Sequence, residues 1–188
     1  AALVNRPGGY AEMGAYNAAS QYLTALLFIP IVLNQALLPM LAERFGARDS
    51  ARSLQLMRAS VWINGLAVWP AAIAGALLSP WLMRIYGASF EGAWLTLVYS
   101  FATAAILALQ VPVGQVLAAS GRMWTGFLMN CGWALVFLAA TFPLVQHGST
   151  GLALARLIAY AMHAGWTMIY ALRVLRHPSD DDSVAPAP

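Results

Sequence analysis

One apolar stretch, Gly151 to Arg173, contains the side chains best suited to bind a charged ligand. Its sequence, GLALARLIAYAMHAGWTMIYALR, is long enough to cross a bilayer, yet it includes an arginine near one end and a histidine in the middle. At about 100° per residue, its strongly polar side chains lie within about 40° of one line along a helix. These are Arg156, Tyr160, His163, Thr167 and Tyr170. Hydrocarbon offers them no partners, so we expect this face to pack against another helix or to line water.

Arg156 admits two interpretations at this position. It lies about 7 Å into the span, at 1.5 Å per residue. Its long side chain could reach back to the outer headgroups, or its planar guanidinium could bind a lipid phosphate or pyrophosphate. The polar face that it shares with His163 favours the anion site. His163 could carry a proton near neutral pH, although a hydrogen-bonded packing role is the simpler interpretation.

The composition indicates a membrane protein. Of the 188 residues, 61% are hydrophobic and 9% are charged, with a mean hydropathy of +0.67. A soluble domain has about a quarter of its residues charged, so these few charges cannot cover a water-facing surface. The net charge of +3 therefore indicates no nucleic-acid partner, because all the basic residues are arginines and most lie between apolar runs. The single cysteine, Cys131, excludes an intrachain disulfide.

Five apolar runs are long enough to cross the roughly 30 Å hydrocarbon core, and none alternates with period two as a membrane strand would. They span about 13–42, 59–83, 92–121, 123–145 and 151–173. We therefore expect residues 1–177 to form an all-α, multi-pass transmembrane bundle. Residues 178–188, rich in Pro, Ser and Asp, should form a disordered cytoplasmic tail. Pro30 and Pro112 should bend their helices.

The arginines between the runs predict an orientation. With five passes, one face of the membrane holds seven arginines and the other holds Arg6 and Arg84. The seven are Arg44, Arg48, Arg52, Arg58, Arg122, Arg173 and Arg176. Positive charge concentrates on the cytoplasmic side, so the loop FGARDSARS and the C-terminus should be cytoplasmic, with YGASFEG and QHGSTG outside. The same arginines could attract anionic membrane lipids.

Motifs for catalysis are missing from the sequence. No nucleotide-binding, zinc-protease or serine-hydrolase motif occurs, so we expect no enzyme, no catalytic residues, no cofactor and no metal site. The carboxylates lie outside the apolar runs or at their ends: Glu12, Glu43, Asp49, Glu91 and Asp180 to Asp182. A carboxylate-driven ion relay would need an acid within the membrane.

Weaker polar faces occur on the other runs. The third run has Thr96, Ser100, Thr103 and Gln110 on one face, interrupted by Leu107, and the first has Asn17, Gln21 and Thr24 at similar spacing. Such groups often bond neighbouring helices. We expect Asn34, Gln35 and Asn64 to hold helices together in this way.

Several short stretches together resemble a known family. In chain order they are GGYAEMGAYNAASQY, IPIVLNQALLPMLAERFGARD, PWLMRIYGASFEGAWLTL, QVLAASGRMW and HGSTGLALARLIAY. Their order and spacing are similar to the C-terminal half of bacterial polysaccharide and O-antigen flippases, which belong to the MATE-like (MOP) exporter superfamily. The resemblance covers residues from about Gly9 to Arg173.

The resemblance implies a fold and an activity. The five runs would be the last five helices of the second of two six-helix lobes, and an N-terminal lobe of the same protein would be the partner. The implied function is to carry an undecaprenyl-pyrophosphate-linked oligosaccharide across the bacterial inner membrane by alternating access. Arg156 would then meet the substrate phosphate.

Three alternatives stay open. One is a cation-coupled exporter of small molecules or drugs on the same scaffold, against which the missing intramembrane acid counts. Another is an intramembrane enzyme of lipid-linked sugar metabolism, for which Glu12 and Glu91 are the only external candidates and form no recognisable pair. The last is a non-transporting membrane scaffold, which would not need the polar face.

Overall fold

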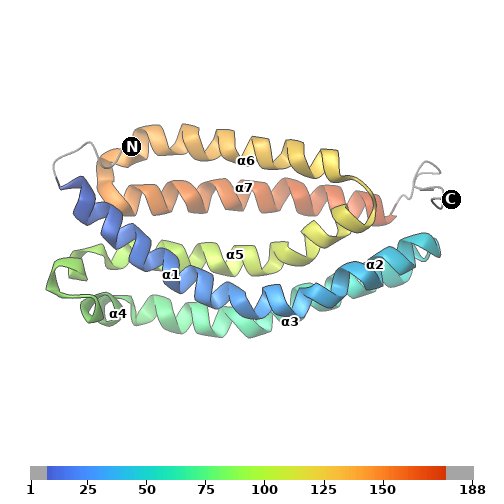
Figure 1. Ribbon diagram of the computed structural model, residues 1–188, viewed down its shortest axis with the longest axis horizontal. Coiled ribbons are helices and arrows are strands. Elements are labelled where there is room, and N and C mark those ends of the chain that lie inside the picture. The colour runs from blue at the N-terminus through green and yellow to red at the C-terminus, as the bar shows by residue number, and fades with distance from the viewer. Residues whose placement is uncertain (1–7, 177–188) are drawn as a thin grey trace.

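The computed structural model describes residues 8–176, and these form helices joined by short turns, without a strand (Figure 1). The expected all-α, multi-pass fold is confirmed. In chain order the elements are α1 Gly9–Leu33, the 3-10 turn η1 Asn34–Ala36, α2 Leu37–Gly46, α3 Ser50–Leu77, α4 Ser79–Ile85, the 3-10 turn η2 Ala88–Ala93, α5 Trp94–Ala119, α6 Met123–Leu144, the 3-10 turn η3 Val145–His147 and α7 Gly148–Arg176.

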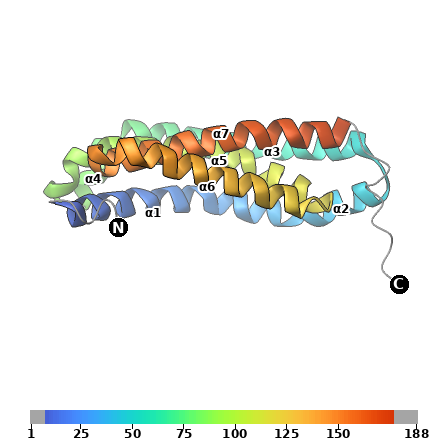
Figure 2. The same ribbon diagram turned by 90° about the horizontal axis from the view of Figure 1, so that it is seen from above.

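Four continuous helical stretches of the described chain are long and apolar enough to cross a membrane. They are Gly9–Gly46, Ser50–Leu77, Ala88–Ala119 and Met123–Arg176. The last stretch folds back at η3 and Gly148, whose φ of 65° favours glycine, so α6 and α7 lie side by side (Figures 1 and 2). The five expected passes are therefore carried by four continuous stretches.

Some helix boundaries differ from the apolar runs, because hydropathy detects the membrane and not the helix. The run 13–42 is divided into α1, η1 and α2. The helix of the second run, α3, begins at Ser50, because the Asp49 carboxylate accepts a hydrogen bond from the Arg52 amide at 3.1 Å and caps it. That helix ends at Leu77, and Pro80 lies in the first turn of the separate helix α4. The proposed tail at 178–188 lies outside the described residues.

The turns divide between two ends of the bundle. One end holds the α2–α3 turn, the α5–α6 turn and the last residues of α7 (Figure 1). We call it the arginine-rich end, after Arg44, Arg48, Arg52, Arg122 and Arg173. The start of α1 and the α6–α7 turn lie at the opposite end. The α2–α3 turn, the α5–α6 turn and the end of α7 thus lie at one end of the bundle, as the expected topology requires. The side of the membrane on which each end lies stays a prediction.

Helix α5 is the centre of the bundle. It packs against α1, α3 and α7, whereas α6 packs mainly against α7. Many buried positions are alanines, and small residues let helices approach closely in a membrane; examples are Ala19 on α1, Ala104 and Ala108 on α5 and Ala159 on α7. Large apolar side chains are exposed on the outer faces, as lipid-facing surfaces require.

Pro112 leaves a backbone carbonyl that an amide side chain satisfies. Pro112 lies within α5 and has no N–H, so the carbonyl of Ala108 lacks its helical donor. Asn64 Nδ2 donates to that carbonyl at 3.0 Å, and Asn34 Nδ2 donates to Asn64 Oδ1 at 3.1 Å. Asn34 Nδ2 also donates to the Pro30 carbonyl at 2.7 Å. These bonds link α1, α3 and α5, as expected for Asn34 and Asn64, whereas Gln35 is exposed.

Both expected bends occur. Helix α1 ends three residues after Pro30, where η1 begins, and the chain changes direction between α1 and α2 (Figure 1). Helix α5 stays continuous through Pro112, and its last turns depart from the line of its first part (Figure 1). Each bend lies close to a proline, which cannot donate the usual backbone bond.

Candidate functional site

Helix α7 is fixed at its start by a residue from the other end of the sequence. The Glu12 carboxylate of α1 accepts a hydrogen bond from the Ser149 amide at 2.7 Å. A carboxylate is favourable at a helix N-terminus, where backbone amides have no helical partner. Nearby, Thr96 Oγ1 of α5 donates to Ser149 Oγ at 3.0 Å. These contacts set the rotation of α7 and hence the direction of its polar face.

Arg156 points into the bundle, between α1, α5 and α7. Its Nη1 donates to Ser20 Oγ at 3.0 Å, and its Nη2 donates to Ser100 Oγ at 2.8 Å. The guanidinium carbon lies 4.8 Å from the centre of the Tyr16 ring, within cation–π distance. The buried Nε has no hydrogen-bond partner. We call Arg156, Ser20, Ser100 and Tyr16 the arginine cluster.

The arginine cluster contains no negative charge. Two ion pairs occur among the described residues, Arg52 with Asp49 and Arg84 with Glu91, and both lie at the ends of helical stretches, away from Arg156. Hydroxyl oxygens accept hydrogen bonds from a guanidinium but do not neutralise it. An arginine within a membrane is costly unless it is paired or hydrated. The Arg156 side chain is half-buried, and its Nε is fully buried.

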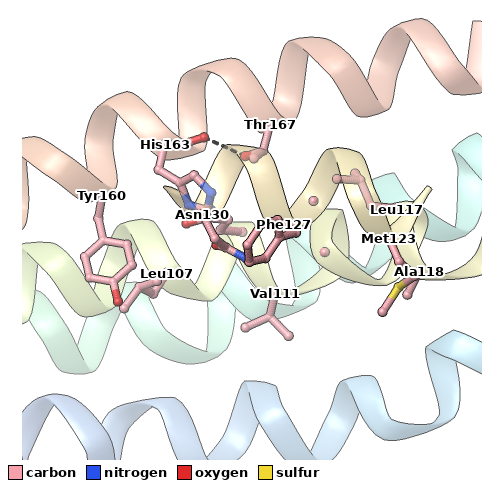
Figure 3. Close-up of a pocket in the computed structure, with 13 residues that line it drawn as sticks. Leu107, Val111, Leu117, Ala118, Met123, Phe127, Asn130, Tyr160, His163 and Thr167 are labelled. Carbon is pink, nitrogen blue, oxygen red and sulfur yellow. Dashed lines mark hydrogen bonds between the residues drawn. The ribbon is translucent and has the colours of Figure 1, made fainter. Parts of the chain in front are cut away.

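A cleft of about 530 Å³ lies between α5, α6 and α7 (Figure 3). We call it the α5–α6 cleft. Its polar lining comes from Gln110, Asn130, Tyr160, His163 and Thr167, and its apolar lining includes Leu107, Val111, Leu117, Met123 and Phe127. Tyr160 and His163 lie toward one end in Figure 3, and Leu117, Ala118 and Met123 lie toward the other. The cleft therefore runs from the middle of α7 to the arginine-rich end.

His163 is held at the inner part of the α5–α6 cleft. Its side chain is hydrogen-bonded through Nδ1 to the Gln110 side chain of α5, and its ring meets Trp166 edge-on at 5.7 Å between centroids. The residue is 8% exposed. Two buried atoms of this pair, His163 Nε2 and Gln110 Oε1, have no hydrogen-bond partner. The pair therefore keeps hydrogen-bonding capacity that no described group uses.

The remaining residues of the predicted face divide between several surroundings. Tyr160 is half-buried, and its ring lies 4.9 Å from the ring centre of Trp133 on α6. Thr167 is buried and donates to the His163 carbonyl at 2.7 Å. Tyr170 does not line the cleft, and its hydroxyl accepts a hydrogen bond from Arg122 Nη1 at 2.9 Å. The structure thus brings Tyr160, His163 and Thr167 together and leaves Arg156 and Tyr170 on either side.

A groove on α1 adjoins the arginine cluster. It is lined by Asn17, Ser20, Gln21 and Thr24. Gln21 Oε1 accepts a hydrogen bond from the Tyr86 hydroxyl at 3.0 Å, and Ser20 is shared with Arg156. The α1 groove therefore offers neutral hydrogen-bonding groups directly beside a guanidinium.

The carboxylates that an enzyme would need are engaged separately. Glu12 accepts from Ser149, as described, and Glu91 pairs with Arg84. The hydrogen bond and the negative charge of Glu91 raise the pKa of the Arg84 guanidinium above its ordinary value. Within residues 8–176, no group of three or more His, Cys, Asp or Glu side chains could hold a metal ion.

Spacing within one helix did not identify every residue around the site. Tyr16, Ser20 and Asn130 were not predicted, although Ser100 was on a recognised polar face. Ser20 is adjacent in sequence to Gln21, and Asn130 is a strongly polar residue in the middle of the apolar helix α6. An isolated amide in a membrane span was the signal for Asn130.

Two named proteins resemble the chain in sequence. It is 25% identical over 154 residues to the EPS I polysaccharide export inner membrane protein EpsE of Ralstonia nicotianae (strain ATCC BAA-1114 / GMI1000) and to the protein of the same name from Ralstonia solanacearum. The match covers 81% of this chain and 35% of each relative, so the chain spans about a third of their length. No family model matches, and no solved structure matches. The chain is thus similar to inner membrane proteins of polysaccharide export.

Proposed function

We propose that this chain is part of a transporter that moves a lipid-linked oligosaccharide across the bacterial inner membrane. The observation that carries the proposal is the arginine cluster, a guanidinium inside the bundle without a negative partner among the described residues. The names of the two relatives support the polysaccharide part of the cargo. The resemblance to flippases supports an undecaprenyl-pyrophosphate carrier.

The chemistry of Arg156 favours a phosphate group as its ligand. A guanidinium forms two parallel hydrogen bonds to phosphate, and such charge-assisted bonds are the strong ones. In the absence of ligand, Ser20 and Ser100 accept these donors and keep the side chain oriented. An arriving phosphate would replace two neutral acceptors with charged ones, so the site is ready for the anion without a large rearrangement.

The α1 groove suits the sugar part of the cargo. Sugars present many hydroxyl groups and little charge, and Asn17, Gln21 and Thr24 are neutral donors and acceptors. The groove is open, and its polar side chains would be costly against lipid. We infer that it faces the remainder of the transporter, since the match covers only 35% of each relative. Alternating access between the two parts would carry the headgroup across.

Replacing Arg156 tests the proposal. In cells that depend on the full-length protein for surface polysaccharide, we expect Arg156→Ala to lower export roughly tenfold to a hundredfold at equal protein abundance, because a hydrogen bond to a charged group contributes about 1.5–3 kcal/mol. We expect Arg156→Lys to restore only part of the activity, since a point charge replaces the planar fork.

Arg52→Ala is the matched control, because Arg52 is exposed and its described ion pair is with Asp49, three residues before it. We expect it to leave export unchanged. Full export by Arg156→Ala, or an equal loss in both variants, would rule out a phosphate-binding role for Arg156.

A further inference from the structure

We propose that His163 and Gln110 form a proton-binding site at the inner end of the α5–α6 cleft, supplied by water from the arginine-rich end. The ligand is a proton delivered by hydronium. The imidazole nitrogen that carries the lone pair takes the proton, one N–H bond forms, and a water molecule remains in the cleft. The site itself is independent of the cargo, and only its use in transport rests on the proposed function.

The unsatisfied atoms of this pair are the first argument. Gln110 contacts Nδ1 of His163, which leaves Nε2 and Oε1 buried without partners. The oxygen and nitrogen of the Gln110 amide exchange places if the amide group is turned by 180°. The amide oxygen then accepts from Nδ1–H of His163, and the amide nitrogen and His163 Nε2 are the two atoms without partners. In either arrangement one donor and one acceptor of the pair have no partner. Where the Gln110 amide oxygen accepts from Nδ1–H, the lone pair of the ring is on Nε2, and this nitrogen takes the proton.

The shape of the cleft is the second argument. Its volume of about 530 Å³ is many times the roughly 30 Å³ that one water occupies in the liquid. Polar groups at its inner part, including the exposed Asn130 amide of α6, provide further hydrogen bonds for a short chain of water. The margin reaches Gly114 and Met123, which are exposed close to the α5–α6 turn. The cleft is therefore open in shape from that end to the middle of α7, along a lining that is apolar except for its inner polar groups.

The groups that face His163 determine how a positive charge on its ring would be stabilised. Across the cleft, α5 presents Gln110 and α6 presents Asn130, both neutral, and Tyr160 is the other titratable group in the lining. The titratable groups of α1 for which a contact with α7 is described are Glu12, at Ser149, and Tyr16, at Arg156. Helix α3 contributes no residue to the lining of the cleft.

Both neighbouring charges along α7 are positive. Arg156 is seven residues before His163, about 10 Å along the helix, and Arg122 contacts Tyr170 seven residues after it. An imidazolium here thus adds positive charge to a region without a described carboxylate. An anionic headgroup on Arg156 would offset that charge, so proton uptake and anion binding should favour each other.

Trp166 provides a readout that does not involve export. Its indole is in edge contact with the imidazole of His163, and a protonated imidazole quenches the emission of an adjacent indole. In purified full-length protein with Trp166 as its only tryptophan, we expect emission to fall as the pH is lowered from about 9 to about 5. We expect the titration to be lost in His163→Gln and retained in His147→Gln, which removes an exposed histidine of η3.

The difference in emission between wild type and His163→Gln, both with all their tryptophans, gives the same measurement if the single-tryptophan protein does not fold. A flat profile from about pH 5 to about pH 9, or a titration that persists in His163→Gln, would overturn the proton site. A third outcome separates the two proposals. If the titration is lost in His163→Gln while Arg156→Ala exports normally, the proposed cargo site is refuted and the proton site is retained.

Discussion

At the scale of single residues, Asn64 performs a task that Pro112 creates. The proline removes one backbone donor from α5, and the Asn64 side chain on α3 supplies a replacement for the Ala108 carbonyl. An unsatisfied buried carbonyl costs about 1–3 kcal/mol. The amide is thus needed because the proline is there, which makes the two positions energetically coupled.

A double-mutant cycle tests this coupling. We expect Asn64→Ala to lower the free energy of unfolding by about 1–3 kcal/mol, measured by equilibrium unfolding in mixed detergent and SDS micelles. In a Pro112→Ala background the new N–H at position 112 can donate to Ala108, so Asn64→Ala should cost much less. Gln35→Ala, at an exposed amide, is the control and should be neutral. Equal costs of Asn64→Ala in both backgrounds would contradict the role of Pro112.

The polar face of α7 could be predicted from the sequence because helical periodicity places residues 3 and 4 positions apart on one side. Its partners could not. Ser20 and Gln110 lie on other helices, and the rotation of each helix about its axis is set by tertiary packing. The sequence therefore indicated that Arg156 and His163 share a face, and only the fold shows that they lie in two different polar clusters.

At the scale of elements, the α6–α7 turn depends on a glycine. A Cβ on Gly151 would lie 1.8 Å from the Leu144 carbonyl oxygen, which is backbone and cannot move aside. Gly165, on the same helix, has nothing within 4 Å of its Cβ position. The close approach of α6 and α7 at this end therefore requires the absence of a side chain at position 151.

We expect Gly151→Ala to lower the free energy of unfolding by about 1–3 kcal/mol, as overpacking does. The abundance of the protein in the membrane should fall as a result. Gly165→Ala is the matched control and should be neutral or slightly stabilising, since alanine favours a helix. Both can be compared by the midpoint of thermal unfolding in detergent. If the two variants melt at the same temperature, the turn is not as tightly packed as the structure indicates.

The order of helices and turns was readable from hydropathy, whereas some helix ends were not. Apolar runs mark where the membrane is, but the start of α3 at Ser50 depends on the Asp49 cap, and the end of α1 lies beside the amide of Asn34, which bonds the Pro30 carbonyl. Such local hydrogen bonds compete with the helix. They act over three or four residues and leave mean hydropathy unchanged.

At the scale of the whole molecule, the arginine-rich end should be cytoplasmic. With Cys131 replaced by Ala, we expect a cysteine at Ser50 to react with a membrane-impermeant thiol reagent only after the cells are permeabilised. A cysteine at Gln146, in the α6–α7 turn at the opposite end, should react in intact cells. Labelling of the Ser50 position from outside would reverse the topology and the direction in which the α5–α6 cleft receives protons.

The bond between Glu12 and Ser149 has a consequence for synthesis in the cell. The two residues are 137 positions apart. Because a ribosome adds about 5–20 residues per second, Ser149 is synthesised on the order of ten seconds after Glu12. Arg156 is synthesised after a similar delay relative to Ser20, whose hydroxyl can donate to the Tyr16 carbonyl before and after Arg156 binds it. Because α6 packs mainly on α7, a nascent chain that stalls before Gly148 leaves α6 unanchored. Such chains should be recognised and degraded by membrane proteases while complete ones survive.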